Sequence, residues 1–216
     1  LWWVQDVAAS LPAKLLRDDA EARVIDLCAA PGGKTLQLAD RGPNVTAVDI
    51  SNQRLSALQE NLARTGLNAD IVDADATQWR PEQPADAVLL DAPCTATGTI
   101  RRHPDIPRRR READIKNATA LQDRLLTAAV NMVAPGGTII YSVCSLEPEE
   151  GTARVDALLA SGAPVTLDPI SADDWPELDG LAPAAVTPAG TLRTLPCHWA
   201  ARGGMDGFFA ARLIRN

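Results

Sequence analysis

The chain lacks most features that would assign it to a membrane-spanning, metal-binding or disulfide-bonded class. It has no run of about 18 apolar residues, and no basic segment with an apolar run and a cleavage site at its start. Its four cysteines form no Cys-x-x-Cys pair, and His103 and His198 show no metal-ligand spacing. We therefore expect a soluble cytoplasmic protein with reduced thiols, no membrane association and no bound metal.

An excess of positive charge is also lacking: 28 Asp and Glu outnumber 21 Lys and Arg, so the net charge is −7. This balance argues against a globally basic nucleic-acid-binding surface, since phosphate contacts need Lys and Arg. The exception is the segment from Arg101 to Arg111, which contains six arginines. Such a basic segment either binds a polyanion or solvates the start of a helix, and charge alone does not separate the two.

Two common nucleotide-binding motifs are absent or incomplete. Residues 28–35 read Cys-Ala-Ala-Pro-Gly-Gly-Lys-Thr, but Cys28 stands where a P-loop has its first glycine, and no Gly-x-Gly-x-x-Gly occurs. Small residues at 29–33 still allow the backbone to approach a ligand, and the following helix start offers N–H groups to a carboxylate. The loop predicts a ligand site without a complete phosphate cradle.

Apolar runs alternate with helical patterns along most of the chain. Strands are predicted at 24–27, 45–50, 69–72, 87–90, 138–143, 165–167 and 207–214, and helices at 1–16, 36–40, 52–64, 118–132 and 151–159. Strands separated by helices pair in parallel through right-handed crossovers. We expect one α/β domain over residues 1–216 with a doubly wound, mostly parallel sheet and an antiparallel C-terminal strand. Residues 1–20 would form a helical segment packed on it, and 168–190 a surface loop.

Chemically useful side chains follow the predicted strands. Asp49, Asp75 and Asp91 each stand at or after a strand end, and Cys94 and Cys144 follow the strands that end at 90 and 143. In the order 3-2-1-4-5, the carboxyl ends of these strands meet at one crevice, where doubly wound folds bind ligands. An acidic residue at the position of Asp49 suits ribose hydroxyls.

Three motifs carry a family resemblance. They are Asp-Leu-Cys-Ala-Ala-Pro-Gly-Gly-Lys-Thr at 26–35, Asp-Ala-Pro-Cys-Thr-Ala-Thr-Gly at 91–98, and Tyr-Ser-Val-Cys-Ser-Leu-Glu-Pro-Glu-Glu at 141–150. In this order they resemble the RNA cytosine-5 methyltransferases. Residues 98–106, Arg193, Pro196 and the segment 206–209 are most similar to the members that modify small-subunit ribosomal RNA.

The resemblance implies a Rossmann-like fold that uses S-adenosylmethionine, and it implies a role for each matching residue. The cofactor would be bound by Cys28, Ala29, Ala30, Pro31, Gly32, Gly33, Lys34, Asp49, Asp75 and Asp91, with Asp49 at the ribose and Asp75 at the adenine. Cys144 would be the nucleophile and Cys94 the thiol that assists product release. Asp91 would contact the methionine end of the cofactor or the target base. The family's longer members carry an upstream RNA-binding helical domain, which we expect this chain to lack.

The chemistry explains why a thiol is needed. C5 of cytosine is a poor nucleophile until a thiolate adds to C6 and breaks the ring conjugation. A thiol with a pKa near 8.5 is only slightly ionised at neutral pH, so Lys34 and nearby arginines are candidates to lower its pKa. A protonated Asp91 is a candidate donor to N3. Spacing alone does not choose the attacking thiol: DNA methyltransferases use a Pro-Cys thiol like Cys94, whereas the RNA family's pattern favours Cys144.

The leading hypothesis is therefore 5-methylcytosine formation in 16S ribosomal RNA, with RNA bound through Arg101–Arg111 by a monomer. One alternative keeps the chemistry but changes the substrate to transfer RNA or another RNA. A second alternative is a noncatalytic RNA-binding or assembly module that retains the cofactor fold.

Overall fold

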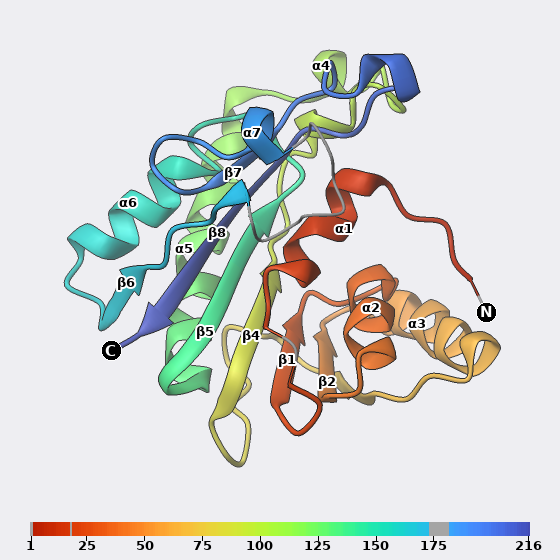
Figure 1. Cartoon of the computed structure of the whole chain (residues 1–216), viewed down its shortest axis with the longest axis vertical. Coiled ribbons are helices and arrows are strands. Elements are labelled where there is room, and N and C mark those ends of the chain that lie inside the picture. The colour runs from red at the N-terminus through yellow and green to blue at the C-terminus, as the bar shows by residue number, and fades with distance from the viewer. Residues whose placement is uncertain (1, 18, 173–181) are drawn as a thin grey trace.

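A computed structural model describes residues 2–17, 19–172 and 182–216, and a central eight-stranded sheet organises them (Figure 1). The strands are β1 (Arg23–Leu27), β2 (Asn44–Asp49), β3 (Asp70–Asp73), β4 (Ala85–Asp91), β5 (Val133–Val143), β6 (Val165–Leu167), β7 (Leu192–Thr194) and β8 (Phe208–Arg215). The helices are α1 (Val7–Lys14), α2 (Gly33–Asp40), α3 (Asn52–Thr65), α4 (Ile106–Arg109), α5 (Glu112–Met132), α6 (Thr152–Ala160) and α7 (Ala182–Ala185). Short 3-10 turns occur at Thr97–Thr99 and Ala200–Arg202.

The strand order confirms the predicted doubly wound topology. The sheet runs β3-β2-β1-β4-β5-β8-β6, and β7 also pairs with β8. β1 to β5 are parallel, whereas β8 is antiparallel to β5, β6 and β7. Asp91 pairs with Ser142 across β4 and β5. The loops that follow these two strands therefore start side by side.

Alternate residues of the strands bury the two faces of the sheet. Ile25, Val88 and Ile139 belong to one apolar cluster with α5 and α6, while Leu89 and Ile140 belong to another with α1. α2 and α3 cover β2 on the same face as α1 through a third cluster. Because both faces are covered, the strands are continuously apolar rather than alternating, as parallel strands usually are.

Several boundaries differ from the predicted ones. α5 begins at Glu112 instead of 118, because the Asp114 carboxylate accepts the backbone N–H of Arg111 at 2.9 Å and starts the helix earlier. The N-terminal helix covers only Val7–Lys14, where Asp6 caps it by accepting the N–H of Ala8 at 2.9 Å. α2 begins at Gly33 rather than 36, after Gly32 at a φ of 105°, a left-handed conformation that favours glycine.

The C-terminal part contains two short elements that the pattern did not predict. α7 and β7 contain four and three residues, too few to show a period. Of the predicted surface loop 168–190, residues 173–181 lie outside the described part, and α7 falls within the remainder. β7 pairs Arg193 with Phe209 of β8, and the Arg193 side chain donates to Ser145 O, just after β5, at 2.5 Å.

Candidate active site

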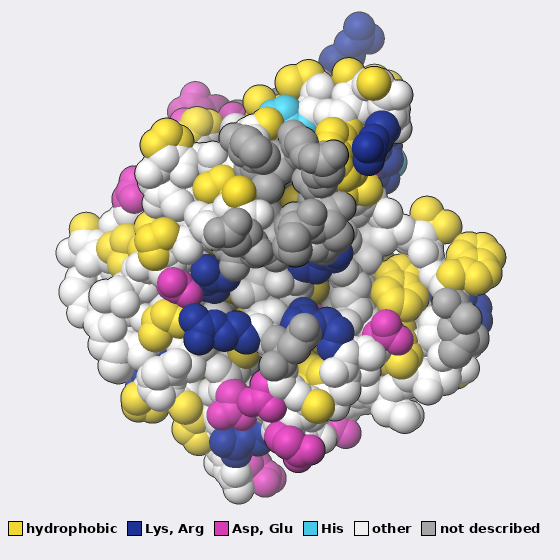
Figure 2. All heavy atoms as spheres, in the orientation of Figure 1, with side chains coloured by type: hydrophobic (Ala, Val, Ile, Leu, Met, Phe, Trp, Pro, Cys, Tyr) yellow, Lys and Arg dark blue, Asp and Glu magenta, His cyan; other side chains and the backbone are white. Residues whose placement is uncertain are grey.

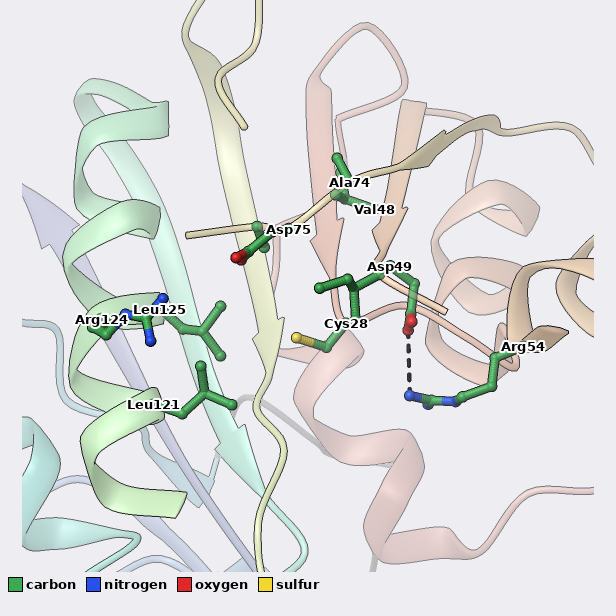
Figure 3. Close-up of a pocket in the computed structure, with 11 residues that line it drawn as sticks. Cys28, Val48, Asp49, Arg54, Ala74, Asp75, Leu121, Arg124 and Leu125 are labelled. Carbon is green, nitrogen blue, oxygen red and sulfur yellow. Dashed lines mark ion pairs between the residues drawn. The ribbon is translucent and has the colours of Figure 1, made fainter. Parts of the chain in front are cut away.

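A pocket lies between the carboxyl ends of β1, β2 and β3 and the middle of α5 (Figure 3). Its lining residues are Cys28, Val48, Asp49, Ile50, Arg54, Ala74, Asp75, Ala76, Leu121, Arg124 and Leu125. The pocket thus contains three of the residues predicted to bind a cofactor, Cys28, Asp49 and Asp75.

The carboxylates of the pocket are held in place by backbone N–H groups. Asp49 is buried and accepts the N–H groups of Ala30 at 3.1 Å and Ser51 at 2.9 Å. It also forms an ion pair with Arg54, with 3.4 Å between Oδ2 and Nη1. Hydrogen bonds from Thr77 hold the pKa of Asp75 below its usual value. These contacts aim both carboxylates from strand ends into one pocket.

Apolar side chains complete the walls of the pocket, and the sequence motifs did not identify them as pocket residues. Ile50 follows Asp49, is 70% exposed and lines the pocket. Leu121 and Leu125 come from α5 and lie across the pocket from Cys28 (Figure 3). The sequence feature that could have identified Ile50 is its position, directly after Asp49, the acidic residue that ends β2.

The loop before α2 uses most of its N–H groups inside the protein. Those of Ala29, Ala30 and Gly32 donate to Val48 O, Asp49 Oδ2 and Ala29 O. The side chains of Ala29 and Ala30 are buried, while Pro31 is exposed. Any ligand contact by backbone N–H groups is therefore left to the start of α2.

A second group of predicted residues lies at the ends of β4 and β5. Lys34 Nζ is 2.7 Å from Asp91 Oδ2, and Ser142 Oγ donates to Asp91 Oδ1 at 3.0 Å. Lys34 is nearly buried in α2, and its Nζ lies 5.1 Å from the centre of the Phe208 ring. Beneath it, Thr35 donates to the buried Asp26 at 2.7 Å. Lys34 thereby connects α2 with the end of β4.

The two predicted catalytic thiols are in contact. Cys94 Sγ and Cys144 Sγ are 3.4 Å apart, and both side chains are partly exposed. The hydrogen bond with Cys144, together with burial, raises the pKa of Cys94 well above its usual value. Burial likewise raises the pKa of Cys28, which belongs to the pocket and not to this pair. The fold thus brings together two thiols that are 50 positions apart.

The basic segment is largely engaged by the protein itself. Arg101 pairs with Asp6 at 2.7 Å, Arg102 with Asp206 at 2.6 Å, and Arg110 donates to Thr95 O at 2.7 Å. In Figure 2, Lys and Arg side chains project at the end of the molecule where α4 lies in Figure 1. A groove beside α4 is lined by Thr97, Ile100, Pro107, Arg110, Arg111, Glu112, Ile115, Leu146 and Glu147.

Other kinds of site find no support within the described residues. No cluster of three or more His, Cys, Asp and Glu side chains there could hold a metal ion. None of the described helices is long and apolar enough to cross a lipid bilayer.

Comparison with known proteins assigns the family. Residues 13–214 match the model of the 16S rRNA methyltransferase RsmB/F family. The chain belongs to this family. It is 39% identical over 218 residues to ribosomal RNA small subunit methyltransferase B of Salmonella arizonae, covering 99% of this chain and 47% of that protein. The Pseudomonas syringae pv. tomato protein of the same name is 42% identical over 221 residues, covering 98% and 47%. The RsmB/F chain described here therefore spans about half the length of these relatives.

Solved structures confirm the predicted methyltransferase fold. NSun6 from Pyrococcus horikoshii, determined with SFG, superposes with a TM-score of 0.81 at 27% identity, over 98% of this chain and 52% of that one. A methyltransferase homologue from the same organism gives a TM-score of 0.77 at 30% identity, over 99% and 68%. Magnesium protoporphyrin IX methyltransferase from Synechocystis, with bound SAM, shares the fold at a TM-score of 0.58 and 14% identity.

Proposed function

We propose that this RsmB/F-family chain transfers a methyl group from S-adenosylmethionine to C5 of a cytosine in 16S ribosomal RNA, through a transient bond between Cys144 and C6. The observation that carries the proposal is the 3.4 Å contact between two partly exposed thiols at adjacent strand ends. Family membership and the names of the relatives support ribosomal RNA as the substrate. They also support the cytoplasm as the place of action.

The pocket at the ends of β1, β2 and β3 fits the proposed cofactor. It combines two carboxylates with an exposed apolar side chain, Ile50, and two leucines from α5. Carboxylates suit ribose hydroxyls and the adenine amino group, and apolar walls suit the adenine faces. Asp49 and Asp75 would hold the adenosine, and the loop from Cys28 to Lys34 the methionine end. When bound, S-adenosylmethionine supplies an electrophilic methyl group on its sulfonium.

The two thiols would divide the work on the base. Attack at C6 requires a thiolate. The family resemblance of the motif at 141–150 assigns this attack to Cys144, whose sulfur would bond to C6 and make C5 nucleophilic. After C5 has taken the methyl group, a base takes the C5 proton, the C5–H electron pair re-forms the C5–C6 double bond, and the C6–S pair leaves with the Cys144 sulfur. Cys94, in contact with Cys144, would assist this release, with its thiolate as the candidate base.

The Lys34–Asp91 pair would act on the charge of the base. Negative charge builds on the ring while the thiolate is attached, and a fixed ammonium group stabilises such charge in a site shielded from water. Lys34 is nearly buried and held by Asp91 at 2.7 Å, which pre-orients it. RNA would approach across the exposed part of the segment from Arg101 to Arg111, beside the groove next to α4.

Trapping of an intermediate tests the proposal. The chain, alone and together with any upstream region that its gene encodes, is incubated with methyl-labelled S-adenosylmethionine and 16S ribosomal RNA. We expect labelled 5-methylcytosine, a gel-stable protein–RNA adduct with Cys94→Ala, and neither product nor adduct with Cys144→Ala. An adduct formed by Cys144→Ala but not by Cys94→Ala would reverse the two roles.

Mass mapping of the modified nucleoside separates the remaining substrates. Label in transfer RNA instead of 16S RNA would change the substrate assignment and leave the mechanism standing. Absence of methyl transfer to every RNA offered, in the presence of the upstream region, would reject the enzymatic proposal in favour of a binding module.

A further inference from the structure

A buried carboxylate, Glu150, lies between the two loops that carry the thiols. Its side chain is fully buried. Oε1 accepts the backbone N–H of Thr95 at 2.9 Å and the Nε2 amide of Gln122 at 3.2 Å. Oε2 accepts the hydroxyls of Thr95 and Ser145. Both oxygens are therefore occupied by donors from three separate parts of the fold.

The donors are the immediate chain neighbours of the thiols. Thr95 follows Cys94 in the loop after β4, and Ser145 follows Cys144 in the loop after β5. The pairing between β4 and β5 ends at Asp91 and Ser142, so it does not reach Thr95 or Ser145. The carboxylate of Glu150 thus connects the two loops beyond the point where strand pairing stops.

Glu150 is itself fixed from two sides. The buried Tyr141 hydroxyl donates to the Glu150 carbonyl oxygen at 2.6 Å, which ties its backbone to β5. Gln122 bridges Glu150 and Pro93 O, the latter at 2.9 Å, which ties the cluster to α5. Both carboxylate oxygens of Glu150 have donors, whereas Oε1 of Gln122 has no partner among the described residues. Buried polar networks in which the charged group is satisfied hold their members in specific positions.

We propose that Glu150 is a positioning residue that holds the thiols of Cys94 and Cys144 in contact. Its catalytic meaning rests on the function proposed above, in which one sulfur bonds to C6 while the other assists at the neighbouring C5. The two sulfurs can act on the adjacent ring atoms C5 and C6 only if they stay close to each other. A clamp on the residues next to both cysteines supplies that constraint.

The donor pattern predicts how substitutions rank. Oε1 faces two N–H groups, which cannot accept a hydrogen bond, whereas Oε2 faces two hydroxyls, which can. Glu150→Gln can therefore place its amide nitrogen at the Oε2 position and keep the clamp. Glu150→Ala leaves a buried N–H of Thr95 without a partner. It loosens the two loops next to the thiols, although the Gly98 N–H still donates to Cys144 O. Glu149→Ala is the matched control, because Glu149 is exposed.

The rate of disulfide formation, compared between variants at a pH that gives each the same thiol ionisation, reports the thiol separation without RNA or cofactor. In a Cys28→Ser/Cys197→Ser background, diamide takes up two protons and two electrons as the Sγ–Sγ bond forms, and the protein loses two hydrogens by mass. We expect Glu150→Ala to slow this reaction about 10-fold or more. Glu150→Gln should stay within about 3-fold of the parent rate, like the Glu149 control.

Folding is checked by circular dichroism, and two milder variants support the test if Glu150→Ala does not fold. Thr95→Val and Ser145→Ala each remove one hydroxyl and should slow the reaction by an intermediate amount. Disulfide formation at the parent rate in every folded variant would overturn the proposal. Fast disulfide formation in a parent that methylates no RNA would instead reject the proposed function and leave the positioning role intact. In methylation assays, the slowed variants should lose kcat with an unchanged KM for the cofactor.

Discussion

Two buried carboxylates support the two halves of the site, and they do so differently. Asp26 lies under the cofactor loop with one hydrogen bond, from Thr35, and its Oδ1 has no partner among the described residues. Burial raises the pKa of Asp26 to about 7, against the opposing effects of Thr35 and Lys34. Glu150 lies under the thiols and accepts bonds from Thr95, Ser145 and Gln122.

The difference lies in what buried side chains add to the backbone hydrogen bonds in each half. The cofactor loop is held mainly through its own N–H groups, those of Ala29, Ala30 and Gly32, and its close approach depends on small residues. The thiol loops are joined by a backbone bond from Gly98 to Cys144 and, in addition, by the buried side chains of Glu150 and Gln122. Substitutions should therefore act mainly on binding in the first half and on chemistry or stability in the second.

The largest effect is expected at Lys34, which joins the two halves. Lys34→Met removes the ammonium group 2.7 Å from Asp91 and the charge available to the base. We expect kcat to fall by about 10²- to 10³-fold. Lys116→Met, which removes an exposed ion pair with Glu112 on α5, should leave kcat unchanged. Equal rates for both variants in single-turnover methylation would contradict the role of Lys34.

Alanine substitutions at two glycines, one in each half of the site, should differ in how much they destabilise the protein. A Cβ on Gly98 would lie 1.8 Å from Gly207 O and 2.9 Å from Cys144 O, so Gly98→Ala must displace backbone. A Cβ on Gly33 would meet only the flexible Gln5 side chain, at 3.5 Å. Urea unfolding should show a loss of about 3 kcal/mol or more for Gly98→Ala and a change below about 1 kcal/mol for Gly33→Ala. Similar stabilities would show that the thiol half tolerates backbone shifts.

Asp26 makes the cofactor half sensitive to pH. Its pKa in the folded protein, about 7, is above its ordinary value, so the folded state binds the proton more tightly. The resulting stabilisation is complete below the unfolded pKa and is lost as the pH rises through about 7. The stability of the parent relative to Asp26→Asn should fall by about 2 to 3 kcal/mol between pH 5 and pH 8. If urea titrations gave the same difference in free energy of unfolding between the parent and Asp26→Asn at every pH, the raised pKa of Asp26 would be refuted.

The smallest effect is expected at Asp75, at the rim of the pocket. Asp75→Ala removes one carboxylate that faces the proposed adenosine, so the Kd for S-adenosylmethionine should rise about 10-fold. The rate at saturating cofactor should change little. Asp70→Ala is the control, because Asp70 is exposed at the opposite end of β3. Calorimetric titration distinguishes the two, and a matching affinity for both would exclude Asp75 from the pocket's function.

The sequence predicted the sheet order and the positions of strand-end residues because these depend on local period and on parallel pairing. The N-cap at Ser51 was also predictable, and its side chain accepts the N–H of Arg54. Glu150 was visible only as the last residue of a motif. Its role depends on donors at Thr95 and Gln122, which no local pattern connects to it. The short β7 and α7 gave no periodic signal for the same physical reason: their positions are set by tertiary pairing with β8 and its surroundings.

The ion pairs at the start of the basic segment affect how RNA affinity should respond to ionic strength. Asp6 and Asp206, 200 positions apart, are linked by a hydrogen bond and both contact Arg101. Arg102 also pairs with Asp206. A guanidinium already neutralised by a carboxylate displaces few counterions from a polynucleotide. The salt dependence of RNA binding should therefore report fewer phosphate contacts than the number of arginines in the segment. Arg101 and Arg102 instead connect the N-terminal and C-terminal parts of the described chain, at Asp6 and Asp206, to the segment that follows Cys94.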